Sequence, residues 1–530
     1  MNIKKNLPIY SIILLIFISC NSRPTAEQKA DREIRSVSGS YKPPIFINDN
    51  RIEKIKEIAP VIQKLIEEHA IENNIPGIAS GIVVGDKLIL ESTTGLINLE
   101  KKLPATTQSC FRIASMTKSF TAMAIMKLRD EGKLFLHDPV TKYIPEMSGM
   151  EYLTSDANVI NIENLLTMTA GFPEDNPWGD RQLDEPDQML INLVTEGISL
   201  SNPSSYQFEY SNTGYALLGN IISRVSGEPY QEYIRQNILQ PLGMYNTYWE
   251  YDSVPADQLV LGYRWEDGQW KLEPMLHDGS FGAMGGLITS IEDFSKYVSF
   301  HLSAWPQRSG ADNGPIKRST LREMHTPQFS RLYANANDFN GNPCAIISGY
   351  GYGLSIATDC NDIKWISHGG ALPGFGSSYF LFPHYGVGLM AFCNLTYTSP
   401  WPFTEIEKLL FETVDLQPRQ LPVSDILVER QGQVVQLIQS WDTDLEAQIL
   451  AENFYLDKSR EDRMNEVKEI LDNAGTIQSV NKITPYNQLR GSFKLQTENG
   501  AITIFFTLTP EKIPKVQYLD ISYYPNEAEK

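Results

Sequence analysis

A serine and a lysine stand one helical turn apart at the start of a strongly apolar stretch. Ser115 and Lys118 open a predicted helix over residues 115–129. Residues i and i+3 share one helix face, so the lysine amine can reach the serine hydroxyl. A serine hydroxyl is a weak nucleophile until a base activates it, and a buried lysine can be that base because burial lowers its pKa. This spacing is typical of nucleophilic catalysis through an acyl-serine.

The Ser-x-x-Lys pattern is weak evidence by itself. A second copy, Ser479 to Lys482, lies in strand-like sequence near the C-terminus. A serine at the start of a helix is also a common N-cap, so Ser115 has an ordinary structural alternative. Further motifs in a defined order are therefore needed before chemistry is assigned to Ser115.

Two such motifs follow along the chain. Tyr-Ser-Asn at residues 210–212 precedes a predicted helix over 215–225, and His-Gly-Gly at residues 368–370 follows a strand-like segment. Each has an alternative: the first as a turn that caps the next helix, the second as a plain turn. Paired glycines also let a strand edge approach a ligand closely and present backbone N–H groups.

The order of these motifs and their intervals of 95 and 158 residues resemble the serine β-lactamase and penicillin-binding-protein superfamily. The match is to its class C-like branch, which includes D-aminopeptidases, family VIII esterases and mitochondrial LACTB-type proteases. The resemblance covers about residues 52–415. The flanking sequences that strengthen it are FRIASMTK at 111–118, LHDPV at 136–140, LLTMTAG at 165–171, YSNTGY at 210–215 and GGLITS at 285–290.

This resemblance implies a role for each matching catalytic residue. Ser115 attacks a carbonyl and becomes acylated, while Lys118 and Tyr210 share the general acid and base work. Asn212 orients Lys118 or hydrogen-bonds a substrate amide. The backbone N–H groups of Ser115 and Ala371 form the oxyanion hole, and water then hydrolyses the acyl-enzyme.

The resemblance also implies a substrate-binding set made of Asn212, His368, Gly369 and Gly370. His368 departs from β-lactamases and DD-peptidases, which usually have a lysine there to help bind a substrate carboxylate. Histidine is shorter and only partly charged near neutral pH. Histidine at this position is common in the D-aminopeptidase, esterase and LACTB-like groups. We therefore expect peptide or ester hydrolysis rather than β-lactam hydrolysis.

Three functions stay open at this point. The leading hypothesis is an exported serine hydrolase that cleaves a small peptide, amide or ester, cell-wall-derived substrates included, through acyl-Ser115. The alternatives are a β-lactamase or D-Ala-D-Ala carboxypeptidase, and a catalytically idle protein that binds or senses peptidoglycan fragments. No cofactor or metal is predicted, because the sequence contains no C-x-x-C or H-E-x-x-H. The absence of G-x-S-x-G argues against an ordinary α/β-hydrolase.

Some features near these motifs have two interpretations. Residues 171–180 are rich in proline and glycine and contain Trp178, which fits either a surface loop or a wall of the substrate cleft. Tyr350 and Tyr352 pose the same choice, and there we favour packing within a strand.

The N-terminus is predicted to be a targeting segment. Residues 1–19 combine two lysines with an apolar run of about a dozen residues, too short to span a bilayer, as in a signal peptide. Ser19-Cys20 resembles the lipobox of bacterial lipoproteins, although Phe17 stands where leucine is usual. We expect a lipidated Cys20 on a bacterial membrane, facing the periplasm or the cell surface, with residues 20–50 as a tether. A plain secretory signal is the alternative.

Four further cysteines allow three complete pairings, and the sequence does not choose among them. An oxidising compartment would permit disulfides. These cysteines are Cys110, Cys344, Cys360 and Cys393.

The elements that must position these residues suggest two folded α+β domains in the 530 residues. Residues 51–416 read as a β-lactamase/transpeptidase-like domain, with an antiparallel sheet flanked by helices and a helical subdomain. Residues 424–530 begin with helices over 425–455 and 460–472 and end in strands, which favours a cystatin-like or nuclear-transport-factor-like domain. The net charge of −19, without a dense basic block, argues against nucleic acid as a partner. The sequence names no protein partner.

Overall fold

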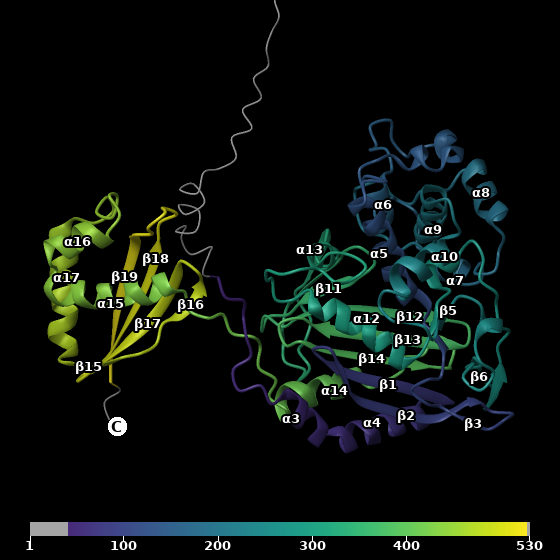
Figure 1. Ribbon diagram of the computed structural model, residues 1–530, viewed down its shortest axis with the longest axis horizontal. Helices are drawn as coiled ribbons and strands as arrows, with labels where there is room; N and C mark the ends of the chain where they lie inside the picture. Colours follow the sequence, from purple (N-terminus) through teal and green to yellow (C-terminus); the bar gives the residue numbers. More distant parts are fainter. Residues whose placement is uncertain (1–40, 527–530) are drawn as a thin grey trace, which may run out of the picture. The chain divides into compact units, whose positions relative to one another are not determined.

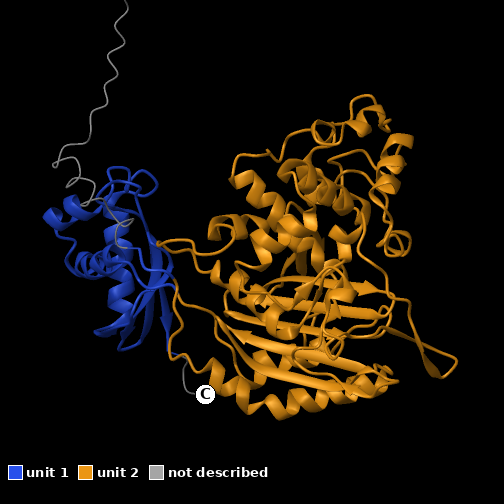
Figure 2. Cartoon of the chain, turned by 45° about the vertical axis from the view of Figure 1, so that its right-hand side comes forward, with its two compact units in different colours: residues 1–43, 421–530 blue, residues 44–420 orange. Residues whose placement is uncertain are grey.

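The computed structural model describes residues 41–526 and divides them into two compact units (Figure 2). The larger unit is Pro44–Gln420, and the smaller contains residues 421–526 together with 41–43. The predicted signal peptide, Cys20 and most of the predicted tether lie outside the described residues. Within residues 41–526, no helix combines the length and apolar character that a membrane span requires.

A nine-stranded antiparallel sheet forms the centre of the larger unit, in the order β3-β2-β1-β14-β13-β12-β11-β10-β9. The hairpin of β1 (Gly77–Val84) and β2 (Lys87–Asn98) pairs with β14 (Val387–Cys393), so distant parts of the sequence share one sheet. The other strands of this sheet are β3 (Leu103–Pro104), β9 (Phe329–Tyr333), β10 (Ile346–Tyr350), β11 (Ser355–Thr358), β12 (Lys364–Leu372) and β13 (Phe375–Phe382).

Helices cover both faces of this sheet, which explains why every residue of β1 is buried. Alternate side chains of β1 enter two different cores. Ala79 and Val83 join the core that contains α5 (Thr117–Asp130), α9 (Asn212–Ser226) and α12 (Ile291–Ser303). The intervening isoleucines and valine join a core with α3 (Arg51–Glu57), α4 (Ala59–Glu72) and α14 (Phe403–Lys408). Figure 1 shows α4 along one face of the sheet.

The remaining helices lie mostly between β4 and β9 and build the predicted helical subdomain. They are α6 (Ile162–Leu166), α7 (Asn176–Gly179), α8 (Asp187–Glu196), α10 (Tyr230–Ile234), α11 (Gly282–Gly285) and α13 (Arg318–Met324). Short strands complete the unit: β4 (Phe111–Arg112), β5 (Thr247–Tyr248) and β8 (Ile288–Thr289) in one sheet, and β6 (Tyr263–Glu266) with β7 (Gln269–Leu272) in another. The predicted α+β architecture is confirmed.

The smaller unit packs three helices against a five-stranded antiparallel sheet. Alternate residues of β18 are buried and pack with apolar residues of the first helix. The cystatin-like or nuclear-transport-factor-like comparison stays a prediction. The elements are α15 (Asp425–Ser440), α16 (Thr443–Ile449), α17 (Arg460–Ala474), β15 (Ile477–Val480), β16 (Thr484–Asn487), β17 (Arg490–Thr497), β18 (Gly500–Leu508) and β19 (Val516–Pro525).

The prediction of a single helix over 425–455 is wrong, because the helix ends at Ser440 and a second one begins at Thr443. Trp441 takes a left-handed conformation with φ of 47°, which ends α15. The Asp442 side chain then accepts hydrogen bonds from two backbone N–H groups and caps α16.

The structure resolves the cysteine pairing that the sequence left open. A disulfide joins Cys344, just before β10, to Cys360, just after β11. It therefore closes the open end of the β10–β11 hairpin. Cys110 and Cys393 are buried free thiols.

Candidate active site

Ser115 lies in a short 3₁₀ turn, Ala114–Met116, immediately before α5. The prediction of a helix from 115 is therefore early by two residues, since α5 begins at Thr117. Ala114 has φ of 50°, in the left-handed region that non-glycine residues rarely adopt. Such strain at a single residue is frequent at functional sites, where the surrounding structure holds it. Here it precedes a serine that lines a cavity.

Lys118 is fully buried beneath that serine. Its Nζ lies 2.9 Å from Ser115 Oγ, 2.7 Å from Asn212 Oδ1 and 2.9 Å from the Met284 carbonyl oxygen. Burial lowers the pKa of Lys118 to about 7, against the attraction of nearby carboxylates. A large fraction of the amine is therefore neutral near pH 7 and able to accept the serine proton.

Asn212 positions Lys118 and does not reach the cavity. Its side chain is 0% exposed, Oδ1 accepts from Lys118, and Nδ2 donates to Asn176 Oδ1 at 3.1 Å. Of the two roles predicted for it, the structure supports the orientation of Lys118. The predicted contact with substrate has no support in this structure, because Asn212 does not line the cavity and both ends of its amide are engaged by protein groups.

The 171–180 segment holds the start of α9 and also forms part of the cavity wall. Asp175 accepts hydrogen bonds from the backbone N–H groups of Asn212 and Thr213 and from the Thr213 hydroxyl. A carboxylate at a helix N-terminus satisfies unpaired donors and complements the helix dipole. Asn176 and Asp180 line the cavity. Both interpretations of this segment therefore apply to different residues within it.

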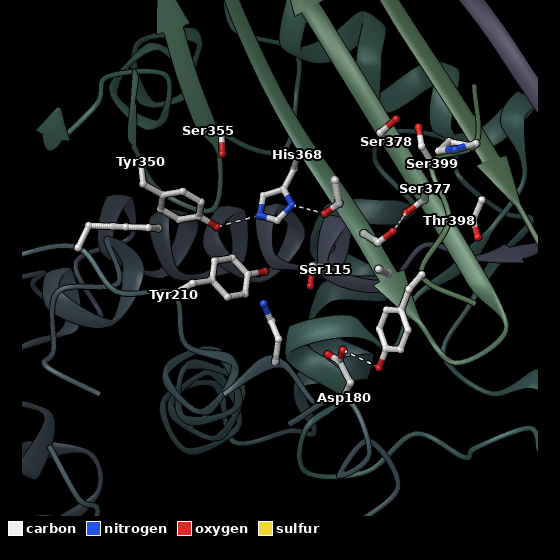
Figure 3. Close-up of a pocket in the computed structure, with 17 residues that line it drawn as sticks. Ser115, Asp180, Tyr210, Tyr350, Ser355, His368, Ser377, Ser378, Thr398 and Ser399 are labelled. Carbon is white, nitrogen blue, oxygen red and sulfur yellow. Dashed lines mark hydrogen bonds between the residues drawn. The ribbon is translucent and has the colours of Figure 1, made fainter. Parts of the chain in front are cut away.

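Tyr210 lies beside Ser115 in the cavity wall (Figure 3). The distance from Lys118 Nζ to the centre of its ring is 5.0 Å. Burial raises the pKa of the Tyr210 hydroxyl, and a hydrogen bond with Ser115 only partly opposes this rise. The phenol is thus protonated in the resting site. Of the two groups, Lys118 is the one whose pKa suits it to accept a proton near neutral pH.

His368 is neutral in this site. Its ring is buried, with Nε2 2.9 Å from the Tyr350 hydroxyl and Nδ1 next to the Gly369 carbonyl. Burial, with a contribution from the charge of Lys118, lowers the pKa of His368 to about 4. A neutral imidazole supplies no fixed positive charge for a substrate carboxylate.

Tyr350 belongs to the site, contrary to the interpretation of strand packing alone. It ends β10, and its ring lines the cavity while its hydroxyl meets His368. Tyr352 does not line the cavity and donates instead to Glu163 Oε1 at 2.7 Å. The sequence offered no means to separate two tyrosines that are two residues apart.

The glycine pair lets β12 pass close to the 3₁₀ turn that carries the nucleophile. A Cβ on Gly370 would lie 2.3 Å from the Ile113 carbonyl oxygen, so only glycine fits there without a shift. The Ser377 hydroxyl on β13 donates to that same carbonyl at 2.8 Å. Gly369, Gly370 and Ala371 line the cavity together with Ser115, as the predicted oxyanion hole requires.

Ser115, Tyr210, Tyr350, His368 and the backbone of residues 369–371 lie around a cavity of about 560 Å³ in the larger unit (Figure 3). Its lining contains no lysine or arginine and a single carboxylate. Across residues 41–526, no three His, Cys, Asp or Glu side chains are arranged to hold a metal ion. The second Ser-x-x-Lys copy starts in β15 of the smaller unit and has no part in this site. The lining residues are Ser115, Asn176, Asp180, Phe208, Tyr210, Tyr350, Ser355, His368, Gly369, Gly370, Ala371, Ser377, Ser378, Tyr397, Thr398, Ser399 and Pro400.

Comparison with known proteins gives a consistent set of relatives. The family model described as Beta-lactamase matches residues 62–410. Beta-lactamase-like protein 2 of Dictyostelium discoideum is 30% identical over 394 residues, 70% of this chain and 67% of that protein. Protein flp of Staphylococcus aureus (strain MW2) is 30% identical over 342 residues. That match covers 63% of this chain and 62% of flp, less than two thirds of its length.

Solved structures share the fold. The octameric penicillin-binding protein homologue from Pyrococcus abyssi has a TM-score of 0.55 and 22% identity, covering 88% of this chain and 96% of that one. A class C β-lactamase has a TM-score of 0.54 and 21% identity, covering 70% of this chain and 99% of that one.

Proposed function

This chain belongs to the β-lactamase family of serine hydrolase-like proteins, and from that premise we propose that it hydrolyses a small peptide, amide or ester through an acyl-Ser115 intermediate. The observation that carries the proposal is the buried amine of Lys118, 2.9 Å from the Ser115 hydroxyl and with a lowered pKa. A base matched to neutral pH next to a nucleophile is what acyl transfer needs.

Acylation begins when neutral Lys118 takes the proton from Ser115 Oγ. The oxygen then attacks the substrate carbonyl and forms a tetrahedral oxyanion. The backbone N–H groups of Ser115 and Ala371 stabilise that oxyanion, and one such donor contributes about 3–4 kcal/mol in comparable sites. Gly370 lies close to the backbone just before Ser115, and this close approach keeps the backbone of Ala371 near that of Ser115.

The oxyanion then collapses, the bond between the carbonyl carbon and the leaving group breaks, and Tyr210 passes its proton to the departing group. The phenol of Tyr210 is protonated in the resting site, and after it has given up that proton the ammonium of Lys118 can reprotonate it. Deacylation runs the same groups in reverse, with water in place of the leaving group. General acid and base catalysis of this kind contributes on the order of 10²–10⁴-fold in rate.

The structure bears on the β-lactamase and D-Ala-D-Ala carboxypeptidase alternatives through charge. Their substrates carry a carboxylate, which a fixed positive group in the cavity would bind. His368 is neutral, and no lysine or arginine lines the cavity. This absence favours amides and esters without that carboxylate. The idle-sensor alternative has no supporting feature, because base, nucleophile and relay residue are all present and in contact.

A panel assay tests the proposal. Purified wild-type protein and the Ser115→Ala variant are given D-amino-acid amides, short peptides, short-chain esters, a chromogenic cephalosporin and a fluorescent penicillin. We expect hydrolysis of amides or esters that Ser115→Ala abolishes. Turnover of the β-lactams in preference to every amide and ester would instead support the β-lactamase alternative. Ligand binding without any turnover would support the sensor.

We propose further that residues 1–19 direct export and that Cys20 carries a lipid anchor to a bacterial membrane. The support is the sequence pattern of lysines, apolar run and Ser19-Cys20. Mass spectrometry of the mature protein made in a bacterium should show an N-terminal lipid-modified cysteine, lost in Cys20→Ala. A mature N-terminus at any other residue would overturn the anchor.

A further inference from the structure

One carboxylate lines the catalytic cavity without an ionic partner. Asp180 follows α7 directly, and only 3% of its surface is exposed. No lysine, arginine or histidine nitrogen lies within 4.0 Å of it among the described residues. A charge this well shielded from water is costly unless something pairs with it.

Asp180 is held in place by one neighbour. The Tyr397 hydroxyl donates to its Oδ2 at 3.2 Å, the one hydrogen bond to this carboxylate within residues 41–526. Tyr397 has φ of 51°, so its backbone is in the left-handed region although it is not a glycine. The fold thus tolerates backbone strain in a residue that lines the cavity and fixes this carboxylate, as is frequent at ligand sites.

The charge and burial of Asp180 suit a group that binds a cation. Burial raises the pKa of Asp180 to about 6, with the charge of Lys118 acting in the opposite direction. The carboxylate is therefore mostly ionised at neutral pH and poorly solvated. A ligand ammonium would restore a charge-assisted hydrogen bond, the stronger class of such bonds.

The position of Asp180 indicates which part of a substrate it meets. Figure 3 shows Tyr210 on one side of Ser115 and Asp180 on another. Tyr210 is assigned to protonate the leaving group, so the leaving group faces Tyr210. A substituent that reaches Asp180 therefore belongs to the acyl part, the part that becomes attached to Ser115.

We propose that Asp180 binds a protonated amine on the acyl part of the substrate, so that the enzyme prefers aminoacyl amides, aminoacyl esters or peptides with a free N-terminus. This inference rests on the proposed function, because it needs an acylated Ser115. It adds a specificity-determining residue and a substrate charge that the catalytic motifs do not define.

A different role for Asp180 makes a different prediction. The carboxylate also attracts the charge of Lys118, so it could act only as a long-range counter-charge for the base. Its removal would then change the reaction of every substrate by the same factor. Binding of a substrate amine requires the loss to be confined to substrates that carry the amine.

The test uses three compounds: the two enantiomers of alanine p-nitroanilide, and propionyl p-nitroanilide, which lacks only the amino group. Each is measured at pH 7 as a substrate and as a competitor that protects Ser115 from a fluorophosphonate probe. The variants are Asp180→Asn and, as a matched control, Asp184→Asn, because Asp184 is exposed and does not line the cavity.

We expect the wild type to favour an alanine compound over the propionyl compound by at least about tenfold, and Asp180→Asn to remove that preference with an about 10–100-fold loss. Asp184→Asn should retain the preference. Equal rates and equal protection for the alanine and propionyl compounds in the wild type, or the same fold-loss for both in Asp180→Asn, would overturn the inference. Labelling of Ser115 by the probe would still leave the proposed function standing in that case. A failure of the probe to label Ser115 would overturn both.

Discussion

Replacement of Asn212 tests the assignment of Lys118 as the base, because two substitutions should move one titration in opposite directions. Asn212 Oδ1 is the nearest of the three oxygens around Lys118 Nζ, at 2.7 Å. Catalysis needs the neutral amine, so the rate of acylation rises with pH through the pKa of Lys118, which is about 7.

The magnitude follows from the hydrogen bond that is lost. A hydrogen bond to a charged group contributes about 1 kcal/mol more than a neutral one, and 1.36 kcal/mol is one pKa unit. Asn212→Leu removes the acceptor, so the ammonium loses more stabilisation than the amine and the pKa of Lys118 falls by about one unit. Asn212→Asp adds a negative charge at the same place and raises the pKa by about 1–3 units.

The assay is the second-order rate of fluorophosphonate labelling of Ser115 between about pH 4.5 and pH 9. The acidic limb of the plot of labelling rate against pH should move to lower pH in Asn212→Leu and to higher pH in Asn212→Asp. The maximum labelling rate should fall in both variants, because Lys118 is less well held. Asn192→Leu, on the exposed face of α8, is the control and should leave the limb in place. Limbs that stay fixed, or that move in the same direction, would refute Lys118 as the titrating base.

Three further outcomes are expected. Tyr210→Phe should slow amide hydrolysis about 10²–10⁴-fold through loss of the proton relay, and an unchanged kcat would contradict that role. Gly370→Ala should lower the Tm of the protein, since its new Cβ would lie 2.3 Å from the nearest atom, whereas Gly369→Ala should not, since there the distance is 3.8 Å. Equal Tm values for the two variants would contradict the close approach. Replacing both Cys344 and Cys360 by serine should lower the free energy of unfolding of the larger unit in urea by about 3 kcal/mol, because a disulfide across 16 residues reduces the conformational entropy of the unfolded chain. A change below about 1 kcal/mol would be inconsistent with this.

The candidate active site was largely predictable because its residues stand in short motifs. The reach from Lys118 to Ser115 follows from helix geometry, and a helix start near residue 115 was within two residues of the observed one. The position of Asn212 was only half predictable. The sequence placed Asn212 just before a helix predicted to start at 215, whereas α9 begins at Asn212 itself. Whether its amide faces the lysine or the cavity depends on the 171–180 segment packed against it.

Residues that come from separate loops could not be found in the same way. Tyr350 and Asp180 carry no motif, and their places in the cavity depend on how β10 and α7 meet elements distant in sequence. The break after α15 was readable in part, because Asp442 followed by two more polar residues is a typical helix start. The amphipathic pattern on either side of Trp441 concealed it.

The central claim is that Ser115, activated by Lys118, forms a covalent acyl-enzyme. The most direct measurement is mass spectrometry of peptides after the protein has reacted with a fluorophosphonate and, separately, with a short-chain ester at low temperature. We predict one adduct on the peptide that contains Ser115, absent from Ser115→Ala and formed far more slowly in Lys118→Met. An adduct on another residue, such as Ser479 in the second Ser-x-x-Lys copy, or unmodified Ser115 with both reagents, would contradict the account.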